Sequence, residues 1–206
     1  MKDIVIVGSS GFAKEILWII ERQNDINEEW NFLGYIDNQN DNNRIIGNDD
    51  FLLNYNKELY VVIAIANTKI RRGLSDLYKK NSKLKFPNII DPSVLMSNSI
   101  KLNEGNIICA GNILTVDVKL GNFNIINLNC TIGHEATIDS FVTLNPNVNV
   151  SGNVHLADGV NIGTGAQIIQ GKQINKDATI GAGAVVINDI EEKCTAVGIP
   201  ARIIHK

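Results

Sequence analysis

The chain contains few of the residues that build metal centres and disulfides, with three histidines and three cysteines among 206 residues. Cys109, Cys130 and Cys194 are an odd number at unrelated spacings, which predicts reduced thiols rather than a disulfide framework. His134 and His155 are well separated, and no cysteine or second close histidine joins either of them. Because a zinc site needs several such ligands together, we predict that the chain holds no metal.

Long apolar runs and basic clusters are also missing. No stretch approaches the roughly 20 apolar residues of a membrane span, and the apolar run at the N-terminus is too short for a signal peptide. The formal net charge is −3, and no basic run or aromatic-basic patch is present. These absences, together with the reduced thiols, predict a cytoplasmic protein that neither inserts into a membrane nor binds nucleic acid.

The second half of the chain has a period of six residues. Stepping by six from Ile90 to Val186 reaches only aliphatic residues or Met. A second row, four residues after each of these, holds small or aliphatic residues, and its exceptions are Asn106, Asn112, Asn124 and Lys172. A helix has a period of 3.6 and a half-buried strand a period of 2, whereas short strands joined by corners repeat every six. The sequence therefore predicts a parallel β-helix whose first row fills the interior, with three hexads in each coil.

The first half of the chain reads as alternating strands and helices. Strands are predicted over residues 3–7, 32–37, 59–65 and 84–89, and helices after the turn at residues 8–13 and over 69–81. A strand, a glycine turn and a helix form the first half of a nucleotide-binding βαβ unit, whose turn can offer backbone N–H groups to a phosphate. Only Gly8 and Gly11 lie in this turn, so the six-residue dinucleotide fingerprint is not met. A tight turn without a ligand is equally compatible with the pattern.

Two further segments of this half carry predictions. Residues 40–50 are polar and rich in Asn, which predicts a solvated loop. The helix over 69–81 is expected to bury one apolar face, formed by Ile70, Leu74, Leu77 and Tyr78. Three basic residues near its start, Lys69, Arg71 and Arg72, would meet a phosphate or, as the simpler interpretation, be solvated. Residues 1–88 are thus expected to form a small Rossmann-like α/β domain, and residues 89–206 the β-helix with its C-terminal cap.

His134 is the histidine whose setting suggests chemistry. It lies at the third position of a hexad, where a side chain need not enter the core, and Glu135 follows it directly. An imidazole titrates near neutral pH, and a neighbouring carboxylate raises its affinity for a proton. The pair suits a general base that takes a proton from an amine or a hydroxyl. A surface histidine beside a surface glutamate is the alternative.

Several motifs occur together in this chain. They are Gly8-Ser-Ser-Gly11, Ile132-Gly-His-Glu-Ala-Thr, Ile180-Gly-Ala-Gly-Ala-Val and the closing Val197-Gly-Ile-Pro-Ala-Arg202. In this combination the whole chain resembles the hexapeptide-repeat sugar acetyltransferases, which include nucleotide-amino-sugar N-acetyltransferases and sialic acid O-acetyltransferases. The resemblance implies a left-handed β-helix after a Rossmann-like domain, acetyl-CoA as co-substrate and a homotrimer.

The resemblance also implies roles for individual residues. His134 would be the general base, and Glu135 would raise its basicity. The nucleotide sugar would contact Ser10, Gly11, Phe12, Asp37, Asn38 and Asn67. Acetyl-CoA would lie in a groove between adjacent β-helices and touch Thr143, Gly152, Thr164 and Ala182. Two positions depart from the family pattern, since Phe12 stands where relatives often have His and Ala66 where they have Gly.

The function implied is transfer of an acetyl group from acetyl-CoA to the amino group, expected at position 4, of a nucleotide-linked amino sugar for surface glycan or glycoprotein synthesis. Two alternatives remain. One is O-acetylation of sialic acid or of another free or polymer-bound sugar, because a hydroxyl acceptor needs a base as much as an amine does. The other is a non-catalytic β-helix that serves as a scaffold or binds a nucleotide sugar.

Overall fold

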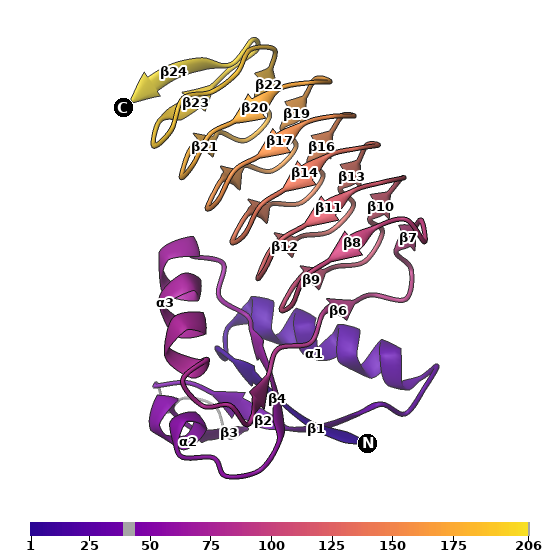
Figure 1. Ribbon diagram of the computed structural model, residues 1–206, viewed down its shortest axis with the longest axis vertical. Coiled ribbons are helices and arrows are strands. Elements are labelled where there is room, and N and C mark those ends of the chain that lie inside the picture. The colour runs from indigo at the N-terminus through magenta and orange to yellow at the C-terminus, as the bar shows by residue number, and fades with distance from the viewer. Residues whose placement is uncertain (39–43, 206) are drawn as a thin grey trace.

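The N-terminal part of the chain is a five-stranded parallel sheet flanked by helices (Figure 1). The computed structural model describes residues 1–38 and 44–205, apart from the side chain of His205. The sheet order is β3-β2-β1-β4-β5, which is that of a doubly wound Rossmann-like fold. The elements are β1 (Lys2–Val7), α1 (Gly11–Asn24), β2 (Trp30–Ile36), β3 (Ile45–Gly47), α2 (Asp49–Leu53), β4 (Leu59–Ile63), α3 (Thr68–Tyr78) and β5 (Leu84–Lys85).

The predicted loop over residues 40–50 is wrong for its second half, because β3 and the start of α2 lie there. Residues 39–43 lie outside the described part of the chain. The helix α2 begins where the side chain of Asn48 accepts hydrogen bonds from the backbone N–H groups of Asp50 and Phe51. Such a cap replaces hydrogen bonds that the first turn of a helix lacks. Asn48, in a polar stretch, is therefore the N-cap of a helix and not a loop residue.

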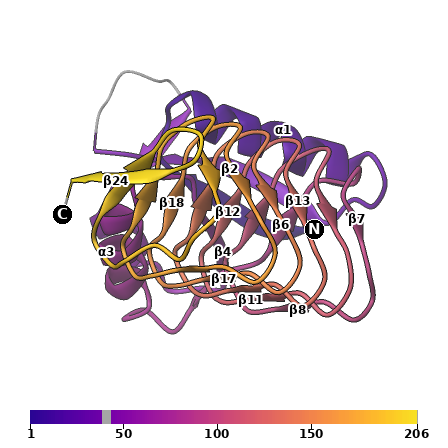
Figure 2. The ribbon, with the colours of Figure 1, turned by 90° about the horizontal axis from the view of Figure 1, so that it is seen from above.

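The second part of the chain is a left-handed β-helix whose coils stack in three parallel sheets (Figures 1 and 2). Sheet I contains β6 (Ile89–Ile90), β9 (Ile107–Ile108), β12 (Ile125–Ile126), β15 (Thr143–Leu144), β18 (Asn161–Ile162), β21 (Thr179–Ile180), β23 (Thr195–Val197) and the antiparallel β24 (Arg202–His205). Sheet II contains β7 (Leu95–Met96), β10 (Ile113–Leu114), β13 (Thr131–Ile132), β16 (Asn149–Val150), β19 (Gln167–Ile168) and β22 (Val185–Val186). Sheet III contains β8 (Lys101–Leu102), β11 (Lys119–Leu120), β14 (Thr137–Ile138), β17 (His155–Leu156) and β20 (Gln173–Ile174).

The predicted interior of the β-helix is confirmed over most of its length. Every first-row residue from Ile108 to Val186 is at most 2% exposed. Met96 is 37% exposed, because it lies in the first coil at the open end of the prism. The three asparagines of the second row are buried as well, and their side chains bond the backbone of neighbouring coils. The amide oxygen of Asn124, for example, accepts from the N–H of Val142 at 2.7 Å. A buried polar side chain is tolerated here because it joins one coil to the next.

The N-terminal domain packs against sheet I. Apolar side chains of α1, including Ile16 and Ile20, share a buried cluster with Ile89, Ile107 and Ile125. Figure 2 shows α1 along one side of the prism and α3 beside another side, where Arg71 of α3 reaches the corner residues Phe123 and Phe141. No helix in the described part of the chain is long and apolar enough to cross a membrane.

An ion pair between Arg22 of α1 and Asp91 joins the two domains. The guanidinium of Arg22 on α1 donates two hydrogen bonds to the carboxylate of Asp91, at 2.8 and 3.2 Å. The N–H and the hydroxyl of Ser93 donate two more to the same carboxylate. Burial alone would raise the pKa of Asp91, but the bonds from Ser93 and Arg22 outweigh it and hold the pKa below the ordinary value of 3.8.

We expect Asp91→Asn to lower the free energy of unfolding by about 2 kcal/mol at neutral pH, because hydrogen bonds to a buried carboxylate are lost. A depressed pKa stabilises the fold above the unfolded-state pKa, and this stabilisation is lost as the pH falls through the folded-state pKa. The difference between variant and wild type in denaturant titrations should therefore shrink on acidification below about pH 4. Asp76→Asn, at an exposed position of α3, is the control. A difference that is equal at all pH values would contradict this assignment.

Candidate active site

The ends of three neighbouring strands meet at the glycine turn. Gly8 has φ +98°, and its N–H donates to the carbonyl of Ile36 at the end of β2. A Cβ on Gly8 would lie 3.0 Å from Cδ1 of Ile65 and 3.3 Å from the carbonyl oxygen of Ala64, both just after β4. The hydroxyl of Ser9 donates to the carboxylate of Asp37 at 2.7 Å. Only glycine fits at this close convergence of β1, β2 and β4.

The convergence gathers the predicted sugar-nucleotide residues along one edge of the sheet. Ser10 is the N-cap of α1 but makes no side-chain cap bond, and Gly11 and Asn38 are exposed. The amide oxygen of Asn67 accepts from the N–H of Ile70 and so caps α3. Phe12 and Asp37 are half-buried. Ligands of open α/β sheets bind at the carboxyl ends of strands, and helix N-termini favour anions, so this edge is suited to a phosphate group.

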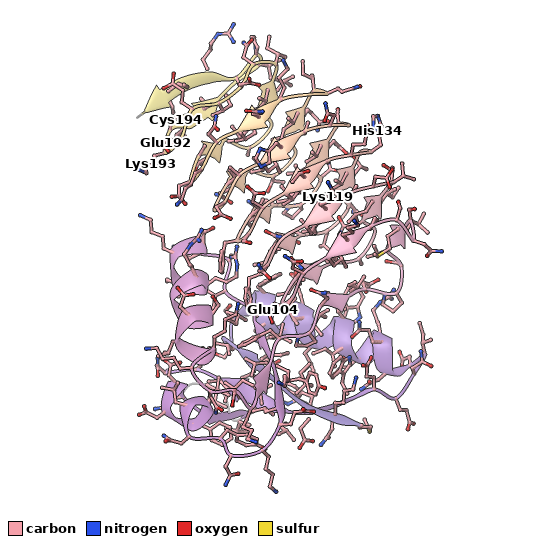
Figure 3. The ribbon with its side chains drawn as sticks, in the orientation of Figure 1. Glu104, Lys119, His134, Glu192, Lys193 and Cys194 are labelled. Atoms are coloured by element: carbon pink, nitrogen blue, oxygen red, sulfur yellow. The ribbon has the colours of Figure 1, made fainter. Side chains whose placement is uncertain are left out.

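The corner between β13 and β14 carries the histidine–glutamate pair. Nδ1 of His134 lies 3.1 Å from Oε2 of Glu135, and the side chains are 50% and 65% exposed. When the carboxylate accepts the Nδ1 proton, Nε2 is left as the basic nitrogen. Glu135 has φ +59°, which turns its side chain back toward the imidazole. Figure 3 shows His134 at the outer edge of the β-helix, on the side away from α3.

Gly152 lies one coil after His134 and makes room for its ring. The N–H of Asn153 donates to the carbonyl of His134 at 2.7 Å, which places the two corners in contact. A Cβ on Gly152 would lie 2.5 Å from Cε1 of His134. Gly152 was predicted as an acetyl-CoA contact, and its packing against the imidazole was missed. The 18-residue coil spacing was the signal that could have revealed this packing.

The other predicted acetyl-CoA residues lie on different parts of the prism. Thr143 is 3% exposed on sheet I and accepts a hydrogen bond from Arg71. Thr164 and Ala182 are neighbours at the corner between sheets I and II, where the N–H of Gly183 donates to the carbonyl of Thr164. A single chain therefore does not bring the four residues together, and their contact with acetyl-CoA stays a prediction.

A second histidine–carboxylate pair lies on sheet III. Nε2 of His155 is 3.0 Å from Oδ2 of Asp139, a residue of the preceding coil. Asp139 also lines a cleft of about 470 Å³ with Lys101, Lys119 and Ser140. Sequence analysis missed this pair, because the two residues are neighbours only through the stacking of coils. In His155 the carboxylate bonds Nε2, whereas in His134 it bonds Nδ1. The nitrogen without a carboxylate partner is therefore Nδ1 in His155 and Nε2 in His134.

The cysteines are not arranged as nucleophiles. Burial raises the pKa of Cys109 to about 12 and that of Cys130 to about 11, which disfavours the reactive thiolate. Within residues 1–38 and 44–205, no three His, Cys, Asp or Glu side chains are grouped so that they could hold a metal ion.

A cleft of about 500 Å³ separates the start of α3 from sheet I. On one side it is lined by Ala66, Asn67, Thr68 and Lys69, and on the other by Thr143, Asn145, Gly159, Asn161, Asp177 and Thr179. Most of the lining residues are polar, with amides and hydroxyls from both domains. Such groups are suited to the hydroxyl-rich surface of a sugar or a ribose.

Known proteins resemble this chain in sequence and in fold. The PglD N-terminal domain family matches residues 3–78. WeeI from Acinetobacter baumannii AYE is 30% identical, with a TM-score of 0.88 over 99% of this chain and 100% of WeeI. The chain belongs to the hexapeptide-repeat sugar acetyltransferase family. It is an acyltransferase by this membership.

Two further members of similar structure were solved with ligands. A variant of perosamine N-acetyltransferase from Caulobacter crescentus, in complex with CoA and GDP-perosamine, is 25% identical, with a TM-score of 0.91 over 100% of this chain and 98% of that one. The acetyltransferase domain of PglB from Neisseria gonorrhoeae FA1090, in complex with acetyl coenzyme A, is 24% identical, with a TM-score of 0.91 over 98% and 99% of the chains. The second likeness shows the shared fold.

We expect Gly152→Ala to displace the imidazole of this acetyltransferase while leaving the fold intact. The three atoms nearest to the new methyl group would all belong to the His134 ring. A misplacement of about 1 Å can cost about 10²-fold in rate. The measurements are kcat and the thermal midpoint, with Gly73→Ala on α3, where a Cβ meets nothing within 4 Å, as the control. Full activity of Gly152→Ala would show that the position of the ring does not matter.

Proposed function

We propose that this acetyltransferase moves the acetyl group of acetyl-CoA to the amino group of a nucleotide-linked amino sugar. The observation that carries the proposal is the exposed His134–Glu135 pair, whose geometry leaves Nε2 as a base in a protein of this family. The likeness to a perosamine N-acetyltransferase that binds CoA and GDP-perosamine supports this substrate class. Residues 1–88 would bind the nucleotide, and residues 89–206 would carry the transfer.

In the proposed mechanism both substrates are bound together. The acceptor nitrogen attacks the thioester carbonyl carbon as Nε2 of His134 takes its proton. The C–S bond then breaks, and the thiolate of CoA leaves with the proton that the imidazolium returns. Glu135 holds the Nδ1 proton and stabilises the imidazolium. Backbone N–H groups near Gly152 would hold the oxygen anion of the intermediate. No step needs a covalent acetyl-enzyme, in line with the buried thiols.

The assembly that fits this mechanism is a homotrimer. Within one chain the nucleotide edge belongs to a domain packed on sheet I, whereas His134 lies at the opposite corner, between sheets II and III. A neighbouring copy would bring an acceptor to this corner, and a closed three-fold ring gives every copy the same contact. Light scattering should then give about three times the chain mass of 22.6 kDa. A mass of one chain at catalytic concentration would contradict the trimer.

We expect His134→Ala to lower kcat about 10² to 10⁴-fold while the affinity for acetyl-CoA stays near that of the wild type, because general-base catalysis is removed. Steady-state kinetics and calorimetric titration with CoA measure the two quantities. His155→Ala is a matched control, since it also removes a histidine paired with a carboxylate on the β-helix surface. Near-normal turnover of His134→Ala, or an equal loss in His155→Ala, would remove His134 from its role.

The acceptor class is tested by ligand-induced stabilisation. A ligand that binds the folded protein increases the free energy of unfolding, by about 2.7 kcal/mol at a concentration of 100 times its Kd. The thermal midpoint rises as a result. We expect a rise with one of the UDP-, GDP- or dTDP-linked 4-amino sugars and a further rise when CoA is added. A rise with CoA alone would favour O-acetylation of a free sugar. No rise with any ligand would favour a non-catalytic β-helix.

A further inference from the structure

Arg71 is buried, and within residues 1–38 and 44–205 its guanidinium forms no ion pair with a carboxylate. Its position at the start of α3 suggested a solvated side chain or a phosphate contact, yet it is 1% exposed. The expected apolar face of α3 is wrong at Ile70, which is 54% exposed while Arg71 next to it points inward. Burial, and to a lesser extent the charge of Arg72, lower the pKa of Arg71 to about 10, so it still carries its charge at neutral pH. A buried charge is costly unless hydrogen bonds replace its water.

Hydrogen bonds from all five N–H donors of the guanidinium replace that water. Nε donates to the carbonyl of Phe123 at 2.9 Å. Nη1 donates to the carbonyls of Ile65 and Ala66, both at 2.8 Å. Nη2 donates to the carbonyl of Phe141 and to the hydroxyl of Thr143, both at 2.9 Å. One side chain thereby joins the segment between β4 and α3 to two successive coils of the β-helix.

The two phenylalanines whose carbonyls accept from Arg71 have an unusual backbone conformation. Phe123 and Phe141 occupy equivalent corners of successive coils, with φ of 54° and 62°. Other coils place Gly105, Gly159 and Asp177 at this corner. A bulky residue with positive φ is rare and costs free energy, so such positions are often tied to function. The two rings stack at 5.6 Å, and the guanidinium of Arg72 lies 4.3 Å from the centre of the Phe141 ring.

The segment that Arg71 holds is the one that carries Asn67. Ile65 and Ala66 directly precede Asn67, and Ala66, Asn67 and Thr143 all line the cleft between α3 and sheet I. The hydroxyl of Thr143 accepts a hydrogen bond from Nη2 of Arg71 and so belongs to this network. Fixing two consecutive carbonyls leaves the backbone before Asn67 little freedom. One guanidinium therefore ties the segment before Asn67 to the β-helix.

We propose that Arg71 is a positioning residue for the acceptor substrate, and that Thr143 acts through Arg71 rather than by touching acetyl-CoA. The proposal rests on the proposed function, because it concerns how the nucleotide-linked sugar is held. Arg71 touches neither substrate. It holds the segment with Asn67 against the β-helix, so that a sugar nucleotide bound at the strand ends meets a pre-formed cleft. Pre-formed contacts improve binding because no ordering has to occur when the substrate arrives.

The same domain interface offers a matched control. Arg22 also joins the two domains through a guanidinium. It lies near the C-terminal end of α1 and bonds Asp91, not the segment that carries Asn67. Replacing Arg22 weakens the interface without touching the cleft. Any effect that comes only from looser domain packing should therefore appear in variants of both arginines.

The experiment compares Arg71→Lys, Arg71→Gln, Thr143→Val and Arg22→Gln, with KM measured for both substrates. Lysine has three donors on one nitrogen and cannot span the five acceptors. We expect both Arg71 variants to raise KM for the nucleotide-linked amino sugar about tenfold or more, and Thr143→Val to raise it about threefold to tenfold, with KM for acetyl-CoA within about twofold of wild type. Arg22→Gln should lower the thermal midpoint and leave the ratio of the two KM values unchanged.

Different failures are distinguishable. Wild-type protein that acetylates no nucleotide-linked amino sugar would reject the proposed function itself. With an active wild type, a rise of KM for acetyl-CoA in Thr143→Val would reject the role of Thr143 and support a donor contact. If the ratio of the two KM values is the same in the Arg71 and Arg22 variants, Arg71 has only a structural role. If the Arg71 variants fail to fold, Thr143→Val alone decides the proposal, because it removes one hydroxyl and keeps the cation.

Discussion

The stacking of each coil on the next, 18 residues later, is the constraint on which the rest of this structure depends. From β6 to β22 the strands have two residues and pair in one parallel register, as in Ile113 with Thr131 and Leu114 with Ile132. Each pair is too short to be stable alone, and the aliphatic rows inside the prism supply the burial that holds the coils together. Every corner residue consequently has a fixed neighbour one coil away. The contact of Gly152 with His134 and the pairing of His155 with Asp139 both follow from that register.

The chemistry of the candidate site follows from where the coils turn. A residue at the third position of a hexad leaves the wall of the prism, so His134 is exposed while its neighbours fill the core. The left-handed backbone of Glu135 brings its carboxylate back to Nδ1. An adjacent pair of residues can thus act as a base and its partner without help from another element. Gly152, one coil later, leaves the space that the imidazole ring occupies.

The interface between the domains combines apolar burial with two buried hydrogen-bonding networks. Aliphatic residues of α1 and of sheet I supply the area, and Arg22 and Arg71 supply direction. Apolar contacts alone allow two surfaces to slide, whereas a guanidinium with all its donors satisfied fits only one arrangement. The family resemblance implies substrate-binding residues on both sides of this interface. We therefore expect its rigidity to affect substrate binding as well as stability.

The sequence by itself determined the β-helix, the strands β1, β2 and β4 of the N-terminal sheet, and the pair His134–Glu135. Periodicity and adjacency are local properties, so a period of six and two neighbouring residues can be read without knowing the fold. Only the tertiary structure decided that Arg71 is buried, that Thr143 faces the domain interface, and that His155 meets Asp139. These contacts join residues far apart in the chain. Arg71, for example, is buried because distant carbonyls accept its hydrogen bonds. Composition carries no record of such partners, and the coil spacing alone does not say which side-chain atoms bond.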